Sequence, residues 1–318
     1  MRYCLGIDLG GTNIAVGLVE LDSKTIVTKK STKTLAPRSA ESIAEDMATL
    51  SRLVTDEAGI QLSDVEWIGV GAPGVVKDDV IVNAPNLDWH NVNIATILRE
   101  KTGIPTYVAN DANAAAYAEY VWGAGVGAKS LVAFTLGTGV GGGIVVDGKI
   151  WEGINGFAAE IGHMIVEEGG RQCGCGKRGC IEAYCSASAI VKEAKRAMKL
   201  YPDSKLWELV GGDIERMNGY YPFVAKREGD FAATEVVDSF INYLAIGISN
   251  IINILQPEVV CIGGGVSGEG DNILIPLRQR VKYLSFGNDS SRTRIEIAKF
   301  RNDAGIIGAG LLGLMRRE

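Results

Sequence analysis

The sequence contains no run of about 18 or more apolar residues, although 47% of its 318 residues are hydrophobic. The longest apolar candidate, LAIGISNIINIL, is interrupted by Ser249, Asn250 and Asn253. The N-terminal segment MRYCLGIDLGGTN also lacks the long apolar core and the cleavage site of a signal peptide. We therefore expect a cytoplasmic protein that does not bind or span a membrane.

Basic residues are too few to suggest a nucleic-acid surface. Lys and Arg total 32 against 38 Asp and Glu, which gives a formal net charge of −6. Nucleic-acid-binding proteins usually carry a basic stripe or tail, and the sequence shows neither. We expect no nucleic-acid partner. The length of the chain favours about two domains.

The six cysteines are too few and too unevenly spaced for a disulfide scaffold. Cys4 and Cys261 stand in apolar, strand-like segments and are predicted to be buried thiols. The other four lie close together, at positions 173, 175, 180 and 185. In a chain without an export signal, such a cluster favours a metal site over disulfides.

Glycine, in contrast, is abundant, with 41 residues. Gly137, Gly139 and Gly142 have the Gly-x-Gly-x-x-Gly spacing of a dinucleotide fingerprint. That fingerprint requires a helix directly after the glycines, because the helix N-terminus binds the pyrophosphate. Here GGIVVDGKI follows, and its β-branched residues and Asp-Gly turn predict a hairpin. We therefore expect no nicotinamide cofactor.

One pattern occurs twice in the chain. IDLGGTNIAVGLVEL begins at residue 7 and FTLGTGVGGGIVVDG begins at residue 134, and each predicts a strand, a turn with Gly and Thr, and a second strand. This duplication predicts two related α/β domains with a cleft between them. Backbone N–H groups of glycine turns can bind phosphate, and Thr12 and Thr138 each add a hydroxyl group. Two ordinary hairpin turns are the alternative, and neither turn is followed by the Gly-Lys-Ser/Thr of a Walker motif.

Helices are predicted between these strands. Apolar residues recur at helical spacing over 39–59, where Ser42 and Glu45 are predicted to form a capping box. Further helices are predicted over about 186–200 and 234–256. The C-terminal DAGIIGAGLLGLMRR is predicted to be a helix whose glycines allow close packing on a neighbour, with a ligand lying against it as the alternative.

Three motifs resemble those of a known family. DLGGTN (8–13) resembles the first phosphate motif of the sugar-kinase and actin superfamily. LGTGVGGGI together with GINGFAAEIGH resembles the signature of the ROK family, and CGCGKRGCIE resembles the zinc loop of that family. The resemblance covers essentially the whole chain in order, and within the family it is strongest for bacterial glucokinases.

This resemblance implies an α/β fold with two duplicated actin/ribonuclease-H-like domains flanking a cleft. A small α/β domain would span 1–122 together with the C-terminal helix 303–318. A larger α/β domain over 123–302 would carry the zinc loop. A homodimer is implied as well.

The implied activity is ATP-dependent phosphorylation of glucose at the 6-hydroxyl, giving glucose 6-phosphate and ADP, with Mg²⁺ as cofactor. The same chemistry on N-acetylmannosamine, mannose or fructose stays open, because hydrogen-bonding residues alone do not fix the stereochemistry at carbon 2. A non-catalytic, sugar-sensing regulator of the family is another alternative. Such regulators carry an N-terminal helix-turn-helix, whereas here the first strand is expected to begin by Tyr3.

The cysteine cluster predicts a structural zinc site. Cys173, Cys175 and Cys180 provide three thiolates and His163 an imidazole, which together complete a tetrahedral site with no open position. A loop of reduced thiols is the alternative, and Cys185 is predicted to be a core residue. The resemblance implies that the second ring nitrogen of His163 contacts a sugar hydroxyl.

A sugar kinase also needs a carboxylate that accepts the proton of the attacking hydroxyl. Asp111 lies where a strand passes into a helix, and a helix N-cap is its alternative role. The resemblance makes Asp111 the catalytic base. It implies that the sugar is bound by Asn86, Asn110, Asp111, Glu160, His163 and Glu182. Trp89 and His90 are predicted to be packing or rim residues.

The nucleotide-binding residues are likewise implied by the resemblance. Asp8 would face the Mg²⁺-bound phosphates, with a strand-end carboxylate capping the glycine turn as the alternative. The remaining expected contacts to ATP are Gly10, Gly11, Thr12, Asn13, Thr138, Gly139, Gly264 and Gly265.

Overall fold

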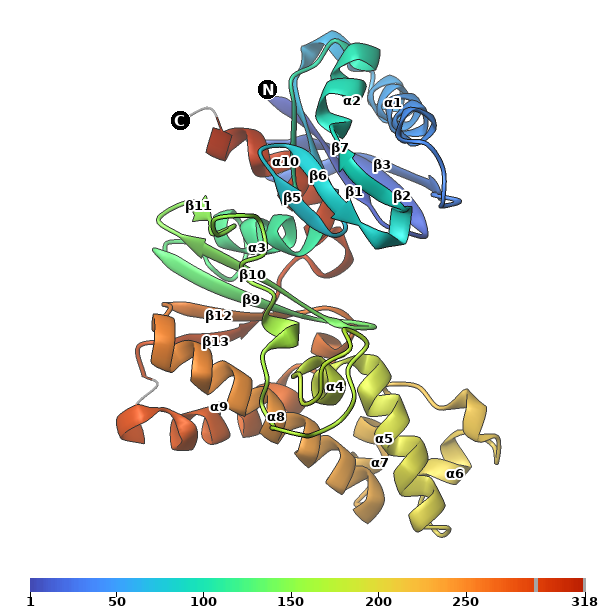
Figure 1. Ribbon diagram of the computed structural model, residues 1–318, viewed down its shortest axis with the longest axis vertical. Helices are drawn as coiled ribbons and strands as arrows, with labels where there is room; N and C mark the ends of the chain where they lie inside the picture. Colours follow the sequence, from blue (N-terminus) through green and yellow to red (C-terminus); the bar gives the residue numbers. More distant parts are fainter. Residues whose placement is uncertain (289–290, 317–318) are drawn as a thin grey trace. The chain divides into compact units, whose positions relative to one another are not determined.

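The computed structural model describes residues 1–288 and 291–316 (Figure 1). The chain divides into two compact units. The first comprises Met1–Ser130, Gly143–Ala159 and Lys299–Glu318, and the second comprises Leu131–Gly142 and Glu160–Ala298. The sequence predicts domains at 1–122 with 303–318 and at 123–302. These limits remain a prediction, because the compact units do not test them.

A five-stranded sheet forms the centre of the first unit. Its strands lie in the order β3 (Thr25–Lys33), β2 (Asn13–Glu20), β1 (Tyr3–Leu9), β4 (Val65–Ala72) and β8 (Thr106–Asn110). Strand β1 is antiparallel to β2 and parallel to β4, and β4 is parallel to β8. The central strands β1 and β4 are buried along nearly their whole length, which is typical of parallel strands covered on both faces.

A second sheet repeats this strand order. Its strands are β11 (Lys149–Ile150), β10 (Val140–Val146), β9 (Ser130–Leu136), β12 (Val259–Gly263) and β13 (Arg294–Ile297). In both sheets the strand before the glycine turn lies in the middle, between its hairpin partner and a parallel strand. Strands β1 and β9 even share one burial pattern. The predicted duplication is confirmed, and the second glycine turn leads into a strand, as expected.

The helices of the first unit follow the predicted pattern with one correction. Helix α1 (Ala40–Glu57) and helix α2 (Ile94–Thr102) pack against each other. The capping box predicted at Ser42 and Glu45 is wrong, because the helix begins one turn earlier. The Ser39 side chain accepts the backbone N–H of Ser42 at 3.2 Å, and Glu45 accepts a hydrogen bond from Lys101 instead.

A small antiparallel sheet lies between β4 and α2 in the sequence of the first unit. It consists of β5 (Val75–Lys77), β6 (Val80–Ala84) and β7 (Trp89–Val92). Trp89 is buried, and its indole N–H donates to the carbonyl of Arg38 at 3.0 Å. The packing role predicted for Trp89 is therefore confirmed.

The second unit is rich in helices. They are α4 (Glu182–Cys185), α5 (Ala187–Leu200), α6 (Leu206–Leu209), α7 (Tyr221–Arg227), α8 (Phe231–Leu255) and α9 (Asp271–Leu284). Helix α8 packs against α5, α7 and α9. In the described part of the chain it is the one helix long and apolar enough to cross a membrane, and 56% of its most apolar window is buried inside the protein, which is the position of a core helix.

Helix α10 (Ala304–Arg316) crosses the first sheet and α3 (Asp111–Val121) at very short range (Figure 1). A β-carbon placed on Gly69 would lie 1.7 Å from the carbonyl oxygen of Ala309, and one on Gly308 would lie 1.8 Å from that of Ala114. Both the helix and its neighbours therefore need glycine at the crossing. The predicted close packing of the C-terminal glycines is confirmed.

We expect Gly308→Ala to destabilise the protein, because the added methyl group must push α10 away from α3. Overpacking of this kind costs about 1–3 kcal/mol of unfolding free energy, which urea unfolding measures. The control is Gly268→Ala, since a β-carbon there has nothing within 4 Å. Equal unfolding free energies for the two variants would contradict the prediction.

Candidate active site

The expected site residues divide between the two units. The first unit holds Asp8, Gly10, Gly11, Thr12, Asn13, Asn86, Asn110 and Asp111. The second unit holds Thr138, Gly139, Glu160, His163, Cys173, Cys175, Cys180, Glu182, Gly264 and Gly265.

In the first unit, Asn110 and Asp111 occupy the junction between β8 and α3. Asn110 caps the helix: its side-chain oxygen Oδ1 accepts hydrogen bonds from the backbone N–H groups of Ala112 at 3.0 Å and Asn113 at 3.1 Å. Its amide nitrogen donates to the carbonyl of Gly74 at 2.9 Å. Asp111 is therefore the first residue of the helix and not its cap, so the alternative role considered for Asp111 is wrong.

Position and charge distinguish Asp111 and Asp8 from ordinary surface carboxylates. Oδ1 of Asp111 accepts the N–H of Ala112 at 2.8 Å, which orients the carboxylate at the start of α3. Asp8, on β1, lies so close to the start of α10 that a β-carbon on Gly305 would be 2.6 Å from its Oδ2. Burial raises the pKa of Asp8 to about 6, and the negative charge of Asp111 adds to this shift.

The turn between β1 and β2 is supported by a residue that the motif did not reveal. The backbone N–H of Gly10 donates to the carbonyl of Asn13 at 2.9 Å. Buried Thr34 donates through its hydroxyl to Gly10 at 2.6 Å and through its backbone N–H to Thr12 at 2.9 Å. Asn86 lies beside this turn, since a β-carbon on Gly11 would be 3.2 Å from that of Asn86.

In the second unit, the turn between β9 and β10 contacts two helices. The carbonyl of Gly137 accepts the N–H of Ala187, the first residue of α5, at 2.8 Å. The N–H of Val140 donates to Oε2 of Glu182, the first residue of α4, at 3.0 Å. A β-carbon on Gly139 would lie 2.4 Å from that oxygen, whereas one on Gly137 would meet nothing within 4 Å. A side chain at 139 would therefore displace the end of the Glu182 side chain, whereas Gly137 leaves open space.

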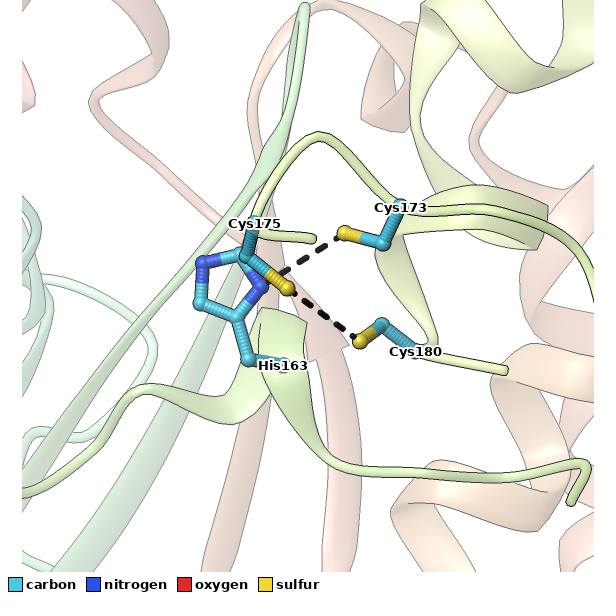
Figure 2. A group of neighbouring side chains, drawn as sticks. All are labelled: His163, Cys173, Cys175 and Cys180. Carbon is cyan, nitrogen blue, oxygen red and sulfur yellow. Dashed lines mark hydrogen bonds between the residues drawn. The ribbon is translucent and has the colours of Figure 1, made fainter. Parts of the chain in front are cut away.

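His163, Cys173, Cys175 and Cys180 come together in a single group (Figure 2). Their ligand atoms all lie within 4.8 Å of one another, with 3.8 Å between Cys173 Sγ and His163 Nδ1 and 3.6 Å between the sulfurs of Cys175 and Cys180. This group could hold a metal ion. The other ring nitrogen of His163 points away from the sulfurs (Figure 2). Cys185 is buried outside the group, as predicted, and so are Cys4 and Cys261.

The loop that carries the cysteines is shaped by two glycines. Gly176 and Gly179 have φ values of +88° and +84°, a conformation that glycine adopts without strain. A β-carbon on Gly179 would also lie 1.7 Å from the carbonyl oxygen of Glu167. Burial raises the pKa of the Cys173 and Cys180 thiols, and the backbone N–H of Lys177 lowers that of Cys175. Metal binding must therefore displace protons from at least two thiols.

A pocket of about 700 Å³ opens in the second unit beside the turn and the cysteine loop. Thr138, Gly139, Cys173 and Glu182 line it, together with residues of α5. Two of these α5 residues are Lys192 and Glu193. Glu193 forms ion pairs with Arg171 and Arg196. No motif in the sequence indicated that α5 contributes to this surface.

The remaining expected residues lie at the edges of these groups. Gly264 packs on the end of β9, since a β-carbon there would be 2.4 Å from the carbonyl oxygen of Leu136. A β-carbon on Gly265 would meet nothing within 4 Å. Glu160 is exposed and precedes the short 3-10 helix Ile161–His163. His90 is exposed as well.

The raised pKa of Asp8 predicts a pH-dependent stability. The folded protein binds this proton more tightly than the unfolded chain, so stability is greatest below the unfolded pKa and falls as the pH rises through about 6. Asn does not titrate, so the unfolding free energy of Asp8→Asn minus that of wild type should increase by up to roughly 3 kcal/mol as the pH rises from about 4 to about 7. Urea unfolding of both proteins across this range measures the difference. A difference that stays constant with pH would argue against the assignment.

Comparison with known proteins gives likenesses along the whole chain. The ROK family model matches residues 4–315. The chain is 37% identical to a glucokinase of Thermotoga maritima, over 96% of this chain and 95% of that protein. It is 29% identical to a xylose repressor of Caldicellulosiruptor bescii, over 96% of this chain and 76% of that protein. A crystal structure of a ROK family glucokinase from Streptomyces griseus, in complex with glucose and AMPPNP, matches with a TM-score of 0.82 and 33% identity, covering 99% of this chain and 100% of that one.

Proposed function

Because the chain belongs to the ROK family, we propose that it is an ATP-dependent sugar kinase that phosphorylates glucose at the 6-hydroxyl, giving glucose 6-phosphate and ADP. The likeness to glucokinases extends over nearly the full length of both chains. The observation that carries the proposal is the pair of carboxylates, Asp8 and Asp111, near a glycine turn in the first unit, matched by a second glycine turn in the duplicated sheet.

Asp111 is the general base of the proposed reaction. Its carboxylate accepts the proton of the 6-hydroxyl, and that oxygen then attacks the γ-phosphorus of ATP in line while the bond to the β-phosphate oxygen breaks. The Ala112 N–H orients the carboxylate from one side. Asn110, whose side chain makes three hydrogen bonds to backbone groups, fixes the start of α3 and with it Asp111, in addition to the sugar contact proposed for it.

The phosphates of ATP are bound by backbone N–H groups of the two glycine turns, around Gly10–Asn13 and Thr138–Gly139. Asp8 fits a Mg²⁺ site, because its buried carboxylate is raised in pKa and lies near a second negative charge, Asp111. A bound cation offsets both charges, and Mg²⁺ would supply charge neutralisation for the phosphates. Gly264 and Gly265 are proposed to border the adenosine.

In this proposal the residues that bind the sugar hydroxyls are Asn86, Asn110, Asp111, Glu160, His163 and Glu182. Glucose is preferred on the basis of the named relatives, and N-acetylmannosamine, mannose and fructose remain the alternatives. The protein is further proposed to be a cytoplasmic homodimer, with domains at 1–122 plus 303–318 and at 123–302.

The group of three cysteines and His163 is proposed to hold a structural zinc ion. Zinc–sulfur bonds of about 2.3 Å in a tetrahedron place sulfur atoms about 3.8 Å apart, close to the 3.6 Å between the sulfurs of Cys175 and Cys180. With four protein ligands the site is closed. The ion would hold the loop together, and His163 would present its second nitrogen to the sugar.

The direct test of the activity is a coupled assay of ADP release with glucose, mannose, N-acetylmannosamine and fructose. The highest kcat/KM is expected with glucose. If the protein binds sugar but releases no ADP with any of the four sugars, the result would instead support a sugar-sensing regulator.

Asp111→Asn is expected to keep glucose binding and to lose turnover by about 10²-fold or more, because the amide preserves shape but cannot accept the proton. Isothermal titration with glucose and the ADP-release assay measure the two effects. More than half of wild-type turnover in this variant would show that Asp111 is not the base.

Cys175→Ala is expected to reduce bound zinc from one ion per chain and to lower the melting temperature, because a structural metal contributes to folding. Elemental analysis and thermal unfolding measure both quantities. Gly268→Ala is the control. Zinc-free wild-type protein purified without chelators would contradict the assignment.

A further inference from the structure

The turn between β1 and β2, here called the first turn, is an opened form of the usual two-residue hairpin. In the usual form the two closing residues exchange a pair of backbone hydrogen bonds. Here the N–H of Gly10 donates to the carbonyl of Asn13 at 2.9 Å, but the return bond between these two described residues is not formed. The Gly10 carbonyl instead accepts the hydroxyl of Thr34 at 2.6 Å. A side chain 24 residues away thus replaces a backbone donor of the turn.

Thr34 holds the first turn at a second point, because its backbone N–H donates to the carbonyl of Thr12 at 2.9 Å. The N–H and C=O groups of a trans peptide point in opposite directions. The N–H groups that follow the two bound carbonyls, those of Gly11 and Asn13, therefore point away from Thr34. In the part of the chain that the structure describes, the N–H groups of Gly11 and Thr12 meet no acceptor. The first turn consequently presents backbone donors to a ligand.

The position of Thr34 is itself fixed by its neighbours. Its side chain is completely buried. Its carbonyl accepts the guanidinium of Arg38 at 3.3 Å, and Arg38 forms an ion pair with Asp46 at 2.6 Å. The next residue, Leu35, has a φ of +52°, which is uncommon for a bulky side chain and persists only where the surrounding structure holds it. The hydroxyl of Thr34 is thus held at one place and does not move freely.

We propose that Thr34 is a positioning residue for the nucleotide, which keeps the first turn open so that its N–H groups can bind the phosphates of a nucleoside triphosphate. The inference rests on the proposed function, which places the phosphates at this turn. Gly11 is half-buried and Thr12 and Asn13 are exposed, so a ligand can reach their backbone. Thr34 is buried and acts through the turn.

Loss of the Thr34 hydroxyl leaves the Gly10 carbonyl without its donor. Acceptors in such a position take another partner where one is within reach, and the usual hairpin supplies the N–H of Asn13. The first turn then closes, and one N–H is withdrawn from the phosphates. Breaking that hydrogen bond again when the nucleotide binds corresponds to a factor of roughly 3 to 10 in the binding constant.

The test is titration of AMPPNP with Mg²⁺ into three variants of Thr34. Thr34→Ala and Thr34→Val remove the hydroxyl and are expected to bind AMPPNP roughly 3- to 10-fold more weakly than wild type. Thr34→Ser retains the hydroxyl and is expected to stay within about twofold of wild type. The Ala variant decides if the Val variant does not fold, because Ala places no methyl group against the Gly10 carbonyl.

The matched control is Thr28→Val. Thr28 lies on β3, which ends directly before Thr34, and its hydroxyl donates to the carbonyl of Val54 in α1 at 2.8 Å. This variant loses the same kind of hydrogen bond away from the first turn. It is expected to lower the melting temperature and to leave the affinity for AMPPNP unchanged.

Two further measurements separate positioning from a general loss of stability. In the Ala and Val variants of Thr34, the KM for ATP should rise while kcat and the KM for glucose stay near the wild-type values. General destabilisation would instead lower kcat through the active fraction and leave the KM for ATP unchanged. Amide hydrogen exchange should show greater protection of the Asn13 N–H in these two variants than in wild type.

Wild-type affinity for AMPPNP in both the Ala and Val variants would overturn the inference and leave the kinase assignment standing. The same holds if Thr34→Ser or Thr28→Val weakens AMPPNP binding as much as Thr34→Ala. Absence of both AMPPNP binding and ADP release in the wild-type protein would overturn the proposed function, and the inference with it.

Discussion

Close approach of backbone segments is the constraint on which this structure depends. Helix α10 contacts the first sheet and α3 at distances that leave no room for a β-carbon on either side, as Gly69 and Gly308 show. The same constraint operates in the second unit, where a β-carbon on Gly264 would lie 2.4 Å from the carbonyl oxygen of Leu136. Glycine is costly within helices, so its repeated use in α10 is understandable only as the requirement of this crossing. The N-terminus of α10 is thereby fixed beside Asp8.

The ionisation of the Asp8 carboxyl follows from this packing. Asp8 is carried by a central, buried strand, and its carboxyl is taken out of water near a second carboxylate, Asp111. The charged form of Asp8 is disfavoured until a cation or a hydrogen-bond donor arrives. A carboxylate in this state is poorly suited to stabilising the fold and well suited to binding a metal–phosphate ligand. The stability that the fold gains by burying β1 is partly lost at this residue, which is typical of functional sites.

Much of this arrangement could be predicted from local sequence. The hairpins follow from β-branched residues and Asp-Gly, and the metal group follows from the short spacing of its cysteines, since neighbouring residues must lie close together. Contacts between distant residues could not be predicted in this way. Thr34 supports the first turn from 24 residues away and Glu182 meets Val140 across 42 residues, and no spacing rule encodes either contact. The cap of α1 shows the same limit at short range: Ser39 and Ser42 both suit the position by residue type, and in the structure Ser39 has the extended backbone of the cap while Ser42 lies inside the helix.

The duplicated turns show why local pattern alone does not define function. Both lie between the central strand and its hairpin partner, and both contain Gly and Thr. The first is supported by a neutral hydroxyl and backbone group of Thr34 within its own unit. The second is supported by the start of α5 and by the charged side chain of Glu182, which also contacts the cysteine loop. The support of the second turn therefore includes a charged group beside the cysteine loop, whereas the first turn is supported by Thr34, whose hydroxyl group carries no charge. Two copies of one hairpin thus differ in what can alter them, and the difference comes from the residues that support each turn and not from the turns themselves.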